Sequence, residues 1–396
     1  MSKHKPCVAV VGAGIAGLTA SILLQQAGYE CTIYEQAPQF RRLGAGINLA
    51  PNSIRIFRSI GIEQKLRRVG ILPRHKFNRE WDTGRMIFSV PVPQLNEMYG
   101  APFMAFHRGD LHDVLASAVT PESFRLGKRF KSLELHESTV HLEFDDGSTA
   151  VADAVIGADG VHSRVRDAIR GPEPPDYYGH VAYRSIFPRA LLGDLELADN
   201  ARWWGPDRYL LTYFMSEARD QVYVVTGGPE EWGGSDLAPM QVEPRRLHAA
   251  FAGFHPSVQR VLEQCSEVSR WPMLVRPPGL PWGHGPVTLL GDACHPMTPH
   301  LGQGGGMAVE DAAILVRCLE SVHGQDPALA FRLYETNRFE RTAKAQRKSQ
   351  EDEWGRGKMD HEWLYGYDAL TVPIAPLPER VREDAAPTQK LLGPAH

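Results

Sequence analysis

The sequence predicts an α/β fold in which a parallel sheet flanked by helices is joined to a second, mixed sheet. An apolar run at 8–11 leads through three glycines into a helical stretch at 18–27, and a second buried strand at 286–290 leads through a glycine loop into a long helix at 307–319. Between about 177 and 271 the sequence pattern changes to alternating, strand-like segments rich in aromatic residues. The first two observations indicate the parallel sheet, and the third indicates the mixed sheet.

The three N-terminal glycines predict a dinucleotide site in a Rossmann-like unit. Gly12 makes the tight turn, Gly14 lets the backbone approach a pyrophosphate, and Gly17 allows the helix to pack on the strand. The N-terminus of the helix adds free N–H groups and the positive end of a dipole. The next strand, 30–34, ends at Glu35, whose carboxylate lies where it can accept hydrogen bonds from a ribose. A glycine-rich turn without a ligand is the alternative.

The elements that follow are mostly short. We expect a glycine-punctuated loop at 41–52 able to lie against a flat ligand, a helix at 53–60, and a hairpin at 76–92 around Thr83 and Gly84. A further helix begins near 108, with Asp110 as its N-cap. Three segments, 129–135, 139–144 and 149–156, predict an antiparallel meander. Strands at 181–187, 209–215 and 221–226 belong to the mixed sheet, and helices continue over 328–354.

Composition and charge exclude several classes of function. The chain has 396 residues, 43% hydrophobic and 23% charged, which is typical of a globular protein of one large or two closely joined domains. A net charge of −4 without a dense basic block argues against nucleic acid and membrane partners. The five scattered cysteines argue against a metal site and favour a reducing cytoplasm. The apolar stretch after Lys3 and Lys5 is explained by the glycine turn rather than by an export signal.

Four stretches, in order along the chain, carry a family resemblance. They are the N-terminal turn with Glu35, Arg108 in a His-Arg-Gly-Asp-Leu run, Gly157-Ala-Asp-Gly160, and Gly291-Asp292 with the glycine loop after it. Over about residues 7–368 the chain resembles the FAD-dependent aromatic-ring hydroxylases, the single-component flavoprotein monooxygenases. The resemblance implies a para-hydroxybenzoate-hydroxylase-like fold, in which a mixed-sheet substrate domain is inserted into a Rossmann-like FAD-binding domain.

This resemblance divides the chain into parts. The FAD-binding domain is expected at 1–75, 106–176 and 276–325, and the substrate domain at 76–105 and 177–275. C-terminal helices are expected at 326–370, followed by a flexible tail at 371–396. The family uses FAD as cofactor and NAD(P)H and O2 as co-substrates, and the sequence has no second G-x-G-x-x-G, as expected where nicotinamide binds only transiently. A monomer or a homodimer is expected, with no metal.

The resemblance also implies cofactor-binding residues. Asp159 and Arg164 resemble residues placed around the nicotinamide and FAD, and a turn acid with a surface arginine is the alternative for that pair. The expected FAD contacts are Gly12, Ala13, Gly14, Ile15, Ala16, Gly17, Glu35, Gln36, Arg42, Ala45, Gly46, Arg108, Asp159, Asp292, Pro299, Gly302, Gly304, Gly305, Gly306 and Met307.

The substrate is expected to be a small hydroxylated ring acid. Activating the ring requires a group that hydrogen-bonds or deprotonates its hydroxyl, and Tyr213 and His300 are the candidates. Packing roles in the core are the alternatives for both residues. The candidate substrate-binding residues are Asn48, Tyr209, Tyr183 and Arg184, and Arg202 is a further candidate partner for a carboxylate.

Within the family, the chain is most similar to members that act on hydroxypyridine carboxylates of the 6-hydroxynicotinate type, some with loss of the carboxylate. Salicylate and 3-hydroxybenzoate hydroxylases come next. The hydroxynicotinate members carry histidine where this chain has Asn48 and Tyr209, and cysteine where it has Asn200. A flavin oxidase or halogenase, or a flavin-binding protein without catalysis, are alternatives of another class. The Trp-x-Trp-x-Ile-Pro stretch of halogenases is absent from the sequence.

Overall fold

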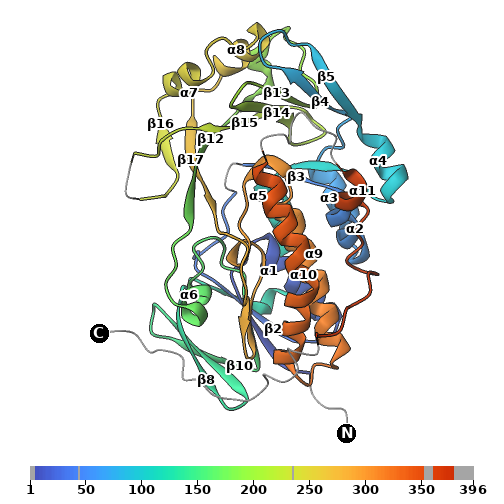
Figure 1. Ribbon diagram of the computed structural model, residues 1–396, viewed down its shortest axis with the longest axis vertical. Helices are drawn as coiled ribbons and strands as arrows, with labels where there is room; N and C mark the ends of the chain where they lie inside the picture. The colour runs from blue at the N-terminus through green and yellow to red at the C-terminus, as the bar shows by residue number, and fades with distance from the viewer. Residues whose placement is uncertain (1–4, 43–44, 234–235, 352–359, 379–396) are drawn as a thin grey trace.

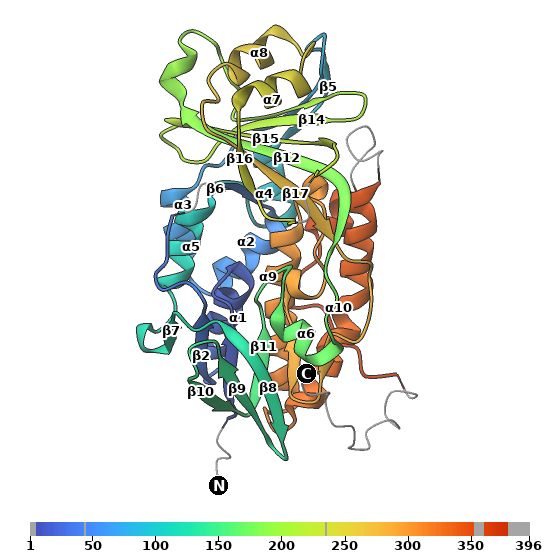
Figure 2. The ribbon, with the colours of Figure 1, turned by 90° about the vertical axis from the view of Figure 1, so that its left-hand side faces the viewer.

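Two large sheets lie one above the other along the long axis of the molecule (Figure 1). The computed structural model describes residues 5–42, 45–233, 236–351 and 360–378. The lower part contains a six-stranded sheet with α1 and the two long helices α9 and α10, and the upper part contains an eight-stranded sheet under α7 and α8 (Figure 2). None of the described helices combines the length and apolarity needed to cross a lipid bilayer.

The six-stranded sheet forms the parallel unit that the glycine turn predicted. Its four central pairings, β1 with β11 and β2, β11 with β19, and β2 with β7, are parallel, and only β18 runs antiparallel. In spatial order the strands are β18 (Gly283–His284), β19 (Val287–Leu289), β11 (Ala154–Gly157), β1 (Cys7–Val11), β2 (Glu30–Glu35) and β7 (Phe124–Leu126).

The eight-stranded sheet is mostly antiparallel and is built from two separate stretches of chain. In spatial order it comprises β16 (Met240–Val242), β17 (Val268–Val275), β12 (Asp176–Pro188), β15 (Gln221–Pro229), β14 (Tyr209–Phe214), β13 (Asn200–Trp204), β4 (His75–Glu80) and β5 (Met86–Pro91). The hairpin predicted at 76–92 is β4 and β5. It joins the sheet through a parallel pairing of β4 with β13.

Two smaller sheets complete the strands. The meander consists of β8 (Phe130–His136), β9 (Thr139–Phe144) and β10 (Thr149–Ala152). The prediction of one strand over 149–156 was wrong, because the chain changes sheets at Asp153, whose carboxylate accepts the backbone N–H of Cys7 at 2.7 Å. The last part becomes β11 of the parallel sheet. A two-stranded sheet pairs β3 (Gly46–Leu49) with β6 (Met104–His107).

The helices pack around these sheets, and α1 and α10 both lie against α9. The α-helices are α1 (Ile15–Gln26), α2 (Pro51–Ser59), α3 (Glu63–Val69), α4 (Val92–Tyr99), α5 (Arg108–Ala116), α6 (Arg164–Arg170), α7 (Pro244–Ala250), α8 (Pro256–Leu262), α9 (Gly304–Ser321), α10 (Pro327–Gln350) and α11 (His361–Tyr365). Short 3-10 turns are η1 (Pro121–Ser123), η2 (Arg189–Leu192), η3 (Gly291–Ala293) and η4 (Pro299–Leu301).

Two expectations about chain ends and caps need correction. The N-cap of α5 is His107, whose Nδ1 accepts the N–H of Gly109, so Asp110 lies in the first turn instead. The predicted flexible tail does not begin at 371, because the Ala375 N–H donates to Asn337 and residues 371–378 run along the long helices. The rest of that prediction, 379–396, lies outside the described residues.

Candidate functional site

The glycine turn between β1 and α1 leaves one open position for a ligand. A Cβ on Gly12, which has φ +104°, would lie 2.5 Å from the carbonyl oxygen of Ala158, and a Cβ on Gly17 would lie 2.0 Å from the Gly12 carbonyl oxygen. A Cβ on Gly14 would meet nothing within 4 Å. Packing therefore requires the first and third glycines, whereas the second faces open space at the N-terminus of α1, where a pyrophosphate fits.

The carboxylate of Glu35 is fixed beside this turn. Its Oε2 accepts the backbone N–H of Ala13 at 2.8 Å, and its Oε1 accepts that of Ala37 at 2.8 Å. Each carboxylate oxygen keeps a further lone pair. Glu35 can therefore still accept a ribose hydroxyl, and exposed Gln36 follows it.

Neither Arg108 nor Asp292 has a hydrogen-bond partner for its side chain among the described residues, and both residues are exposed. Burial lowers the pKa of Arg108 and raises that of Asp292, and each is within electrostatic reach of the other. Both side chains nevertheless remain accessible to solvent. A charged group that is surrounded by protein yet exposed lies at the wall of a cleft. Such free polar groups fit the ribityl chain and polar edges of FAD.

The glycine loop after Asp292 opens α9 earlier than predicted. The helix begins at Gly304, after Gly302 with φ +65°, so its unpaired N–H groups belong to its first turn rather than to Met307. The N–H of Met307 donates to the Gln303 carbonyl at 2.7 Å and its side chain is 0% exposed. Met307 is therefore a core residue. Exposed Pro299 and Gly302, with Gly304, Gly305 and buried Gly306, make up the loop and the first turn.

Two predicted cofactor residues have protein partners that account for them. The Asp159 carboxylate accepts the N–H groups of Arg164 and Val165 at 2.8 and 3.1 Å, which stabilises the start of α6. The exposed guanidinium of Arg42 is held by Asp110, with contacts of 2.6 and 3.0 Å. Neither side chain is left free in the way that Arg108 and Asp292 are.

Tyrosines of the eight-stranded sheet close over β3. A Cβ on Gly46 would lie 2.3 Å from Tyr213 Oη and 2.4 Å from the Tyr223 ring, so the glycine allows the two sheets to approach. The sequence predicts that this loop lies against a flat ligand, and the close contact with the two tyrosines is a further reason for glycine at this position. Ala45 precedes it, is 7% exposed, and accepts the N–H of Arg108 at 2.7 Å.

Three polar groups beside this contact have unused hydrogen-bonding capacity. Asn48 is two residues from Gly46 on β3, so the two share a face, and its buried Oδ1 has no partner. Asn200 is opposite Tyr213 in the β13–β14 ladder, and its buried Nδ2 has no partner either. Tyr213 Oη makes no hydrogen bond with the described residues, although the residue is 3% exposed. Unpaired buried polar atoms of this kind need a partner, which a bound ligand can supply.

The electrostatics assign Tyr213 a donor role. Burial raises its pKa well above the ordinary value, against the opposing effect of Arg184 and Arg202. Tyr213 therefore stays protonated near neutral pH. His300 Nδ1 lies 2.9 Å from the Ser349 carbonyl oxygen and must donate to it, so Nε2 is the basic nitrogen of the neutral ring.

The strand pairing separates two predicted substrate residues. Tyr209 shares a face with Tyr213, and its ring meets that of His300 edge to face at 5.5 Å. Arg184 is on the same face, stacked 4.2 Å from the Trp271 ring with its Nε unpaired. Tyr183, the preceding residue, must point to the opposite face, where its hydroxyl donates to Glu230 at 2.7 Å. The assignment of Tyr183 to substrate binding was therefore wrong.

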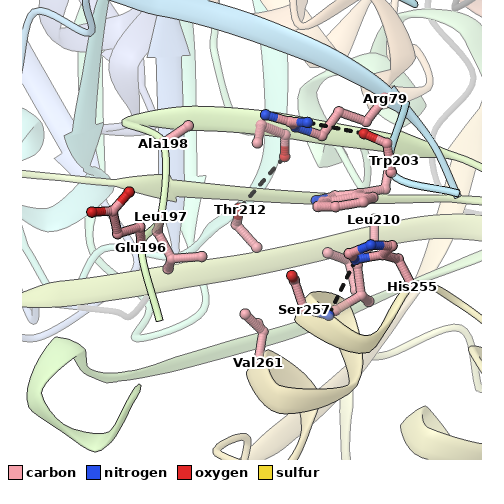
Figure 3. Close-up of a pocket in the computed structure, with 13 residues that line it drawn as sticks. Arg79, Glu196, Leu197, Ala198, Trp203, Leu210, Thr212, His255, Ser257 and Val261 are labelled. Carbon is pink, nitrogen blue, oxygen red and sulfur yellow. Dashed lines mark hydrogen bonds between the residues drawn. The ribbon is translucent and has the colours of Figure 1, made fainter. Parts of the chain in front are cut away.

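A cavity of about 240 Å³ lies on that opposite face of the sheet, under α8 (Figure 3). Trp203 stacks on His255 there at 5.3 Å, and Arg79 donates to the Gly84 carbonyl at 2.9 Å. None of the predicted site residues lines this cavity. The face that carries Tyr213 and Arg184 is therefore the candidate site.

A buried ionic network under the glycine loop was not predicted. Arg338 contacts Asp311 at 2.7 Å and Glu310 at 2.8 Å, Arg341 contacts Glu310 at 2.7 Å, and His295 contacts Asp311 at 2.5 Å. Glu310, Asp311 and Arg338 are all 0% exposed. The signal in the sequence is the acidic pair inside the otherwise apolar stretch 307–319, since buried charges require partners. This network joins α9 to α10 and so supports the loop.

We expect Arg338→Met to lower the free energy of unfolding by about 3–5 kcal/mol, because it leaves two buried carboxylates short of a partner. Urea denaturation followed by tryptophan fluorescence measures this change. Lys131→Met is the matched control, since it removes an exposed pair with Glu143 and should cost no more than about 1 kcal/mol. Equal effects of the two substitutions would show that the network contributes nothing beyond a surface pair.

Comparison with known proteins identifies relatives over nearly the whole chain. The family described as FAD binding domain matches residues 5–182 and 214–349. The chain is 43% identical over 372 residues to 6-hydroxynicotinate 3-monooxygenase of Bordetella bronchiseptica, covering 93% of this chain and 97% of that one. It is 31% identical to 3-hydroxybenzoate 6-hydroxylase of Polaromonas naphthalenivorans, covering 91% and 96%. Klebsiella pneumoniae HpxO complexed with FAD and uric acid superposes with a TM-score of 0.78 at 26% identity, covering 92% of each chain.

Proposed function

Since the chain belongs to the FAD-binding family of aromatic hydroxylases and is a FAD-dependent monooxygenase, we propose that its substrate is a hydroxypyridine carboxylate of the 6-hydroxynicotinate type. FAD bound here would supply the redox chemistry, namely the reduction of O2 by NAD(P)H and the insertion of one of its oxygen atoms into the ring. The observation that carries the proposal is the two unpaired buried atoms Asn48 Oδ1 and Asn200 Nδ2, near a Tyr213 hydroxyl that makes no hydrogen bond with the described residues.

The chain's residues divide into those that hold FAD and those that hold the ring. Backbone N–H groups at the start of α1, beside Gly14, bind the pyrophosphate, and Glu35 binds the adenosine ribose. Arg108 and Asp292 contact the ribityl chain and flavin edge, and the first turn of α9 directs its positive end toward the ring system. Met307 is not assigned a contact with FAD. Asp159 acts by fixing the start of α6, and Arg42 acts by fixing α5 through Asp110.

The ring lies between β3 and the tyrosine face. Tyr213, held protonated by burial, donates to the ring oxygen, and His300 Nε2 accepts a proton near the same position. Asn48 and Asn200 orient the remaining polar ring atoms with their free amide groups. The family resemblance implies histidine and cysteine at these two positions in the hydroxynicotinate members, so we propose that these residues contribute to the choice between pyridine and benzene acids. A hydroxybenzoate substrate is the second candidate, supported by the 31% identical relative.

Asp292→Ala should weaken FAD binding about tenfold or more. It leaves sugar hydroxyls without an acceptor in an enclosed site, a loss of roughly 1–3 kcal/mol. Titration of the apoprotein, followed by quenching of flavin fluorescence, measures the affinity. Asp292→Asn keeps an acceptor oxygen and should retain most of it. If both variants bind FAD like the wild type, the carboxylate has another role.

The substrate proposal is tested by screening ring acids. Purified protein is mixed with NADH or NADPH and each of 6-hydroxynicotinate, salicylate and 3-hydroxybenzoate. The expected result is faster oxidation of the nicotinamide with 6-hydroxynicotinate than with the benzoates, and a hydroxylated product by mass. Stimulation by a benzoate alone would select the second candidate. We further propose that the protein works in the cytoplasm as a monomer or homodimer; all five cysteines are unpaired.

A further inference from the structure

Three basic side chains gather where β4 and β13 lie above α11. Lys76 is on β4 and Arg202 on β13, and the parallel register that pairs Asn78 with Arg202 places Lys76 on the same face, the face of Tyr209 and Tyr213. His361 begins α11 and contributes the third group. Figure 1 shows α4 and α11 beside one another below this edge of the sheet. Lys76, Arg202 and His361 are called the basic cluster below.

No carboxylate from the described part of the chain pairs with Lys76 or Arg202. Arg202 Nη1 donates to the His300 carbonyl at 3.2 Å, and its guanidinium lies 5.0 Å from the Trp204 ring and 4.9 Å from the Tyr209 ring. Lys76 Nζ lies 4.3 Å from the Phe103 ring. Aromatic faces stabilise a cation only in part, so Lys76 and Arg202 lack a counterion among the described residues.

The pKa shifts show that these groups repel one another. Burial, and then Arg202, lower the pKa of Lys76 to about 7. Burial and then Lys76 lower the pKa of His361, and burial lowers that of Arg202. All three side chains nonetheless remain partly exposed. Side chains that are surrounded by protein and are still accessible to solvent line an internal space rather than the outer surface.

That space adjoins the candidate ring pocket through Arg202. The same guanidinium contacts the ring of Tyr209 and the backbone of His300, and these two residues meet each other edge to face. Beyond Arg202, in the direction away from Tyr213, come Lys76 and Phe103. A ring held by Tyr213 and His300 therefore has the basic cluster at one end.

We propose that Arg202 and Lys76 bind the carboxylate of the ring acid and so select acids over neutral rings. The inference rests on the proposed function, because it names the groups that recognise one part of that substrate. A planar guanidinium suits a carboxylate, and Lys76 adds a second positive charge from the neighbouring strand. The bound anion also supplies a counterion to Lys76 and Arg202, which have none among the described residues.

Binding should then depend on pH in a defined direction. Only protonated Lys76 attracts the carboxylate, so in the free enzyme the attraction is strongest at acidic pH and is lost as the pH rises through about 7. The charged or titratable groups facing Lys76 are Arg202 on β13 and His361 on α11. The lowered pKa of His361 keeps its own titration below this range. The dissociation constant of the acid should therefore rise between pH 7 and 9.

The test is an equilibrium titration of the FAD-loaded enzyme, followed by the change in flavin absorbance. The ligands are 6-hydroxynicotinate and 2-hydroxypyridine, which is the same ring without the carboxylate. We expect Arg202→Gln and Lys76→Met each to weaken binding of the acid about 10- to 100-fold and to leave binding of the neutral ring unchanged. Lys76→Met should also remove the rise in dissociation constant between pH 7 and 9. Unchanged binding of the neutral ring shows that the pocket is intact.

Arg79→Gln is the matched control, because it removes one positive charge from the same strand on the opposite face, at the cavity of Figure 3. It should bind both ligands like the wild type. Equal binding of the acid by the wild type and both cluster variants would overturn this inference and leave the proposed function standing. A rise confined to the KM of NADH or NADPH would also overturn it and assign the cluster to the nicotinamide phosphates. A wild type that binds no hydroxypyridine or hydroxybenzoate acid would overturn the proposed function, and the inference with it.

Discussion

Gly14→Val should abolish FAD retention while leaving the fold intact. Gly14 has φ −76°, which valine adopts readily, and a Cβ there meets no protein atom within 4 Å. The branched side chain therefore occupies only the space where the pyrophosphate meets the N-terminus of α1. Losing two charge-assisted hydrogen bonds corresponds to about 3–6 kcal/mol, or roughly 10²- to 10⁴-fold in affinity. Flavin absorbance of the purified variant measures retention, and circular dichroism measures the fold.

Gly17→Ala is the contrasting variant. Its Cβ would lie 2.0 Å from the Gly12 carbonyl oxygen, so it should lower thermal stability whether or not FAD is present. The two glycines thus separate cofactor binding from packing. A Gly14→Val protein with a full complement of flavin would refute the placement of the pyrophosphate.

Tyr213→Phe should slow hydroxylation about 10²-fold with FAD still bound. The substitution removes one unpaired hydroxyl and keeps the ring that packs on Gly46. Because the phenol stays protonated, its hydrogen bond stabilises the deprotonated ring oxygen. Without that donor the substrate hydroxyl keeps its proton more often, and the reacting ring is less electron-rich. More NAD(P)H should be wasted as hydrogen peroxide. Product formed per NAD(P)H consumed measures this coupling.

Tyr183→Phe provides the control for this experiment. That hydroxyl donates to Glu230 on the opposite face of the same sheet, so its removal should leave coupling unchanged. His300→Ala should in addition change the pH profile of turnover, if the imidazole exchanges a proton during the reaction. Coupled turnover like that of the wild type in both Tyr213→Phe and His300→Ala, from pH 6 to 9, would return both residues to packing roles.

Local features of the site were predictable from the sequence, because they depend on neighbouring residues. The glycine turn, the strand that ends at Glu35 and the shared face of Tyr209 and Tyr213 follow from spacing alone. Features that depend on distant partners were not. Strand parity separates Tyr183 from Arg184, yet it does not say which of them faces the flavin side. The answer comes from the pairing of β12 with β15.

Tertiary contacts also decided where elements begin and end. The strand expected over 149–156 divides because Asp153 binds the backbone of Cys7 in the neighbouring sheet. The helix expected at Met307 begins at Gly304, and glycine is required at Gly306, where a Cβ would lie 2.6 Å from Gln303 Oε1. The basic cluster exists only because β4 joins the eight-stranded sheet beside β13, a parallel pairing between distant stretches of chain.

The central claim is that this chain uses FAD to place one atom of O2 on a hydroxylated ring acid, and its most direct test is isotopic. The enzyme is given NADH or NADPH and 6-hydroxynicotinate under isotopically heavy O2, and the product is analysed by mass spectrometry. The account predicts one heavy oxygen atom in the hydroxylated ring and one NAD(P)H consumed per product molecule. Oxidation of NAD(P)H that yields only hydrogen peroxide, with no labelled product from any of the pyridine or benzene acids, would contradict it.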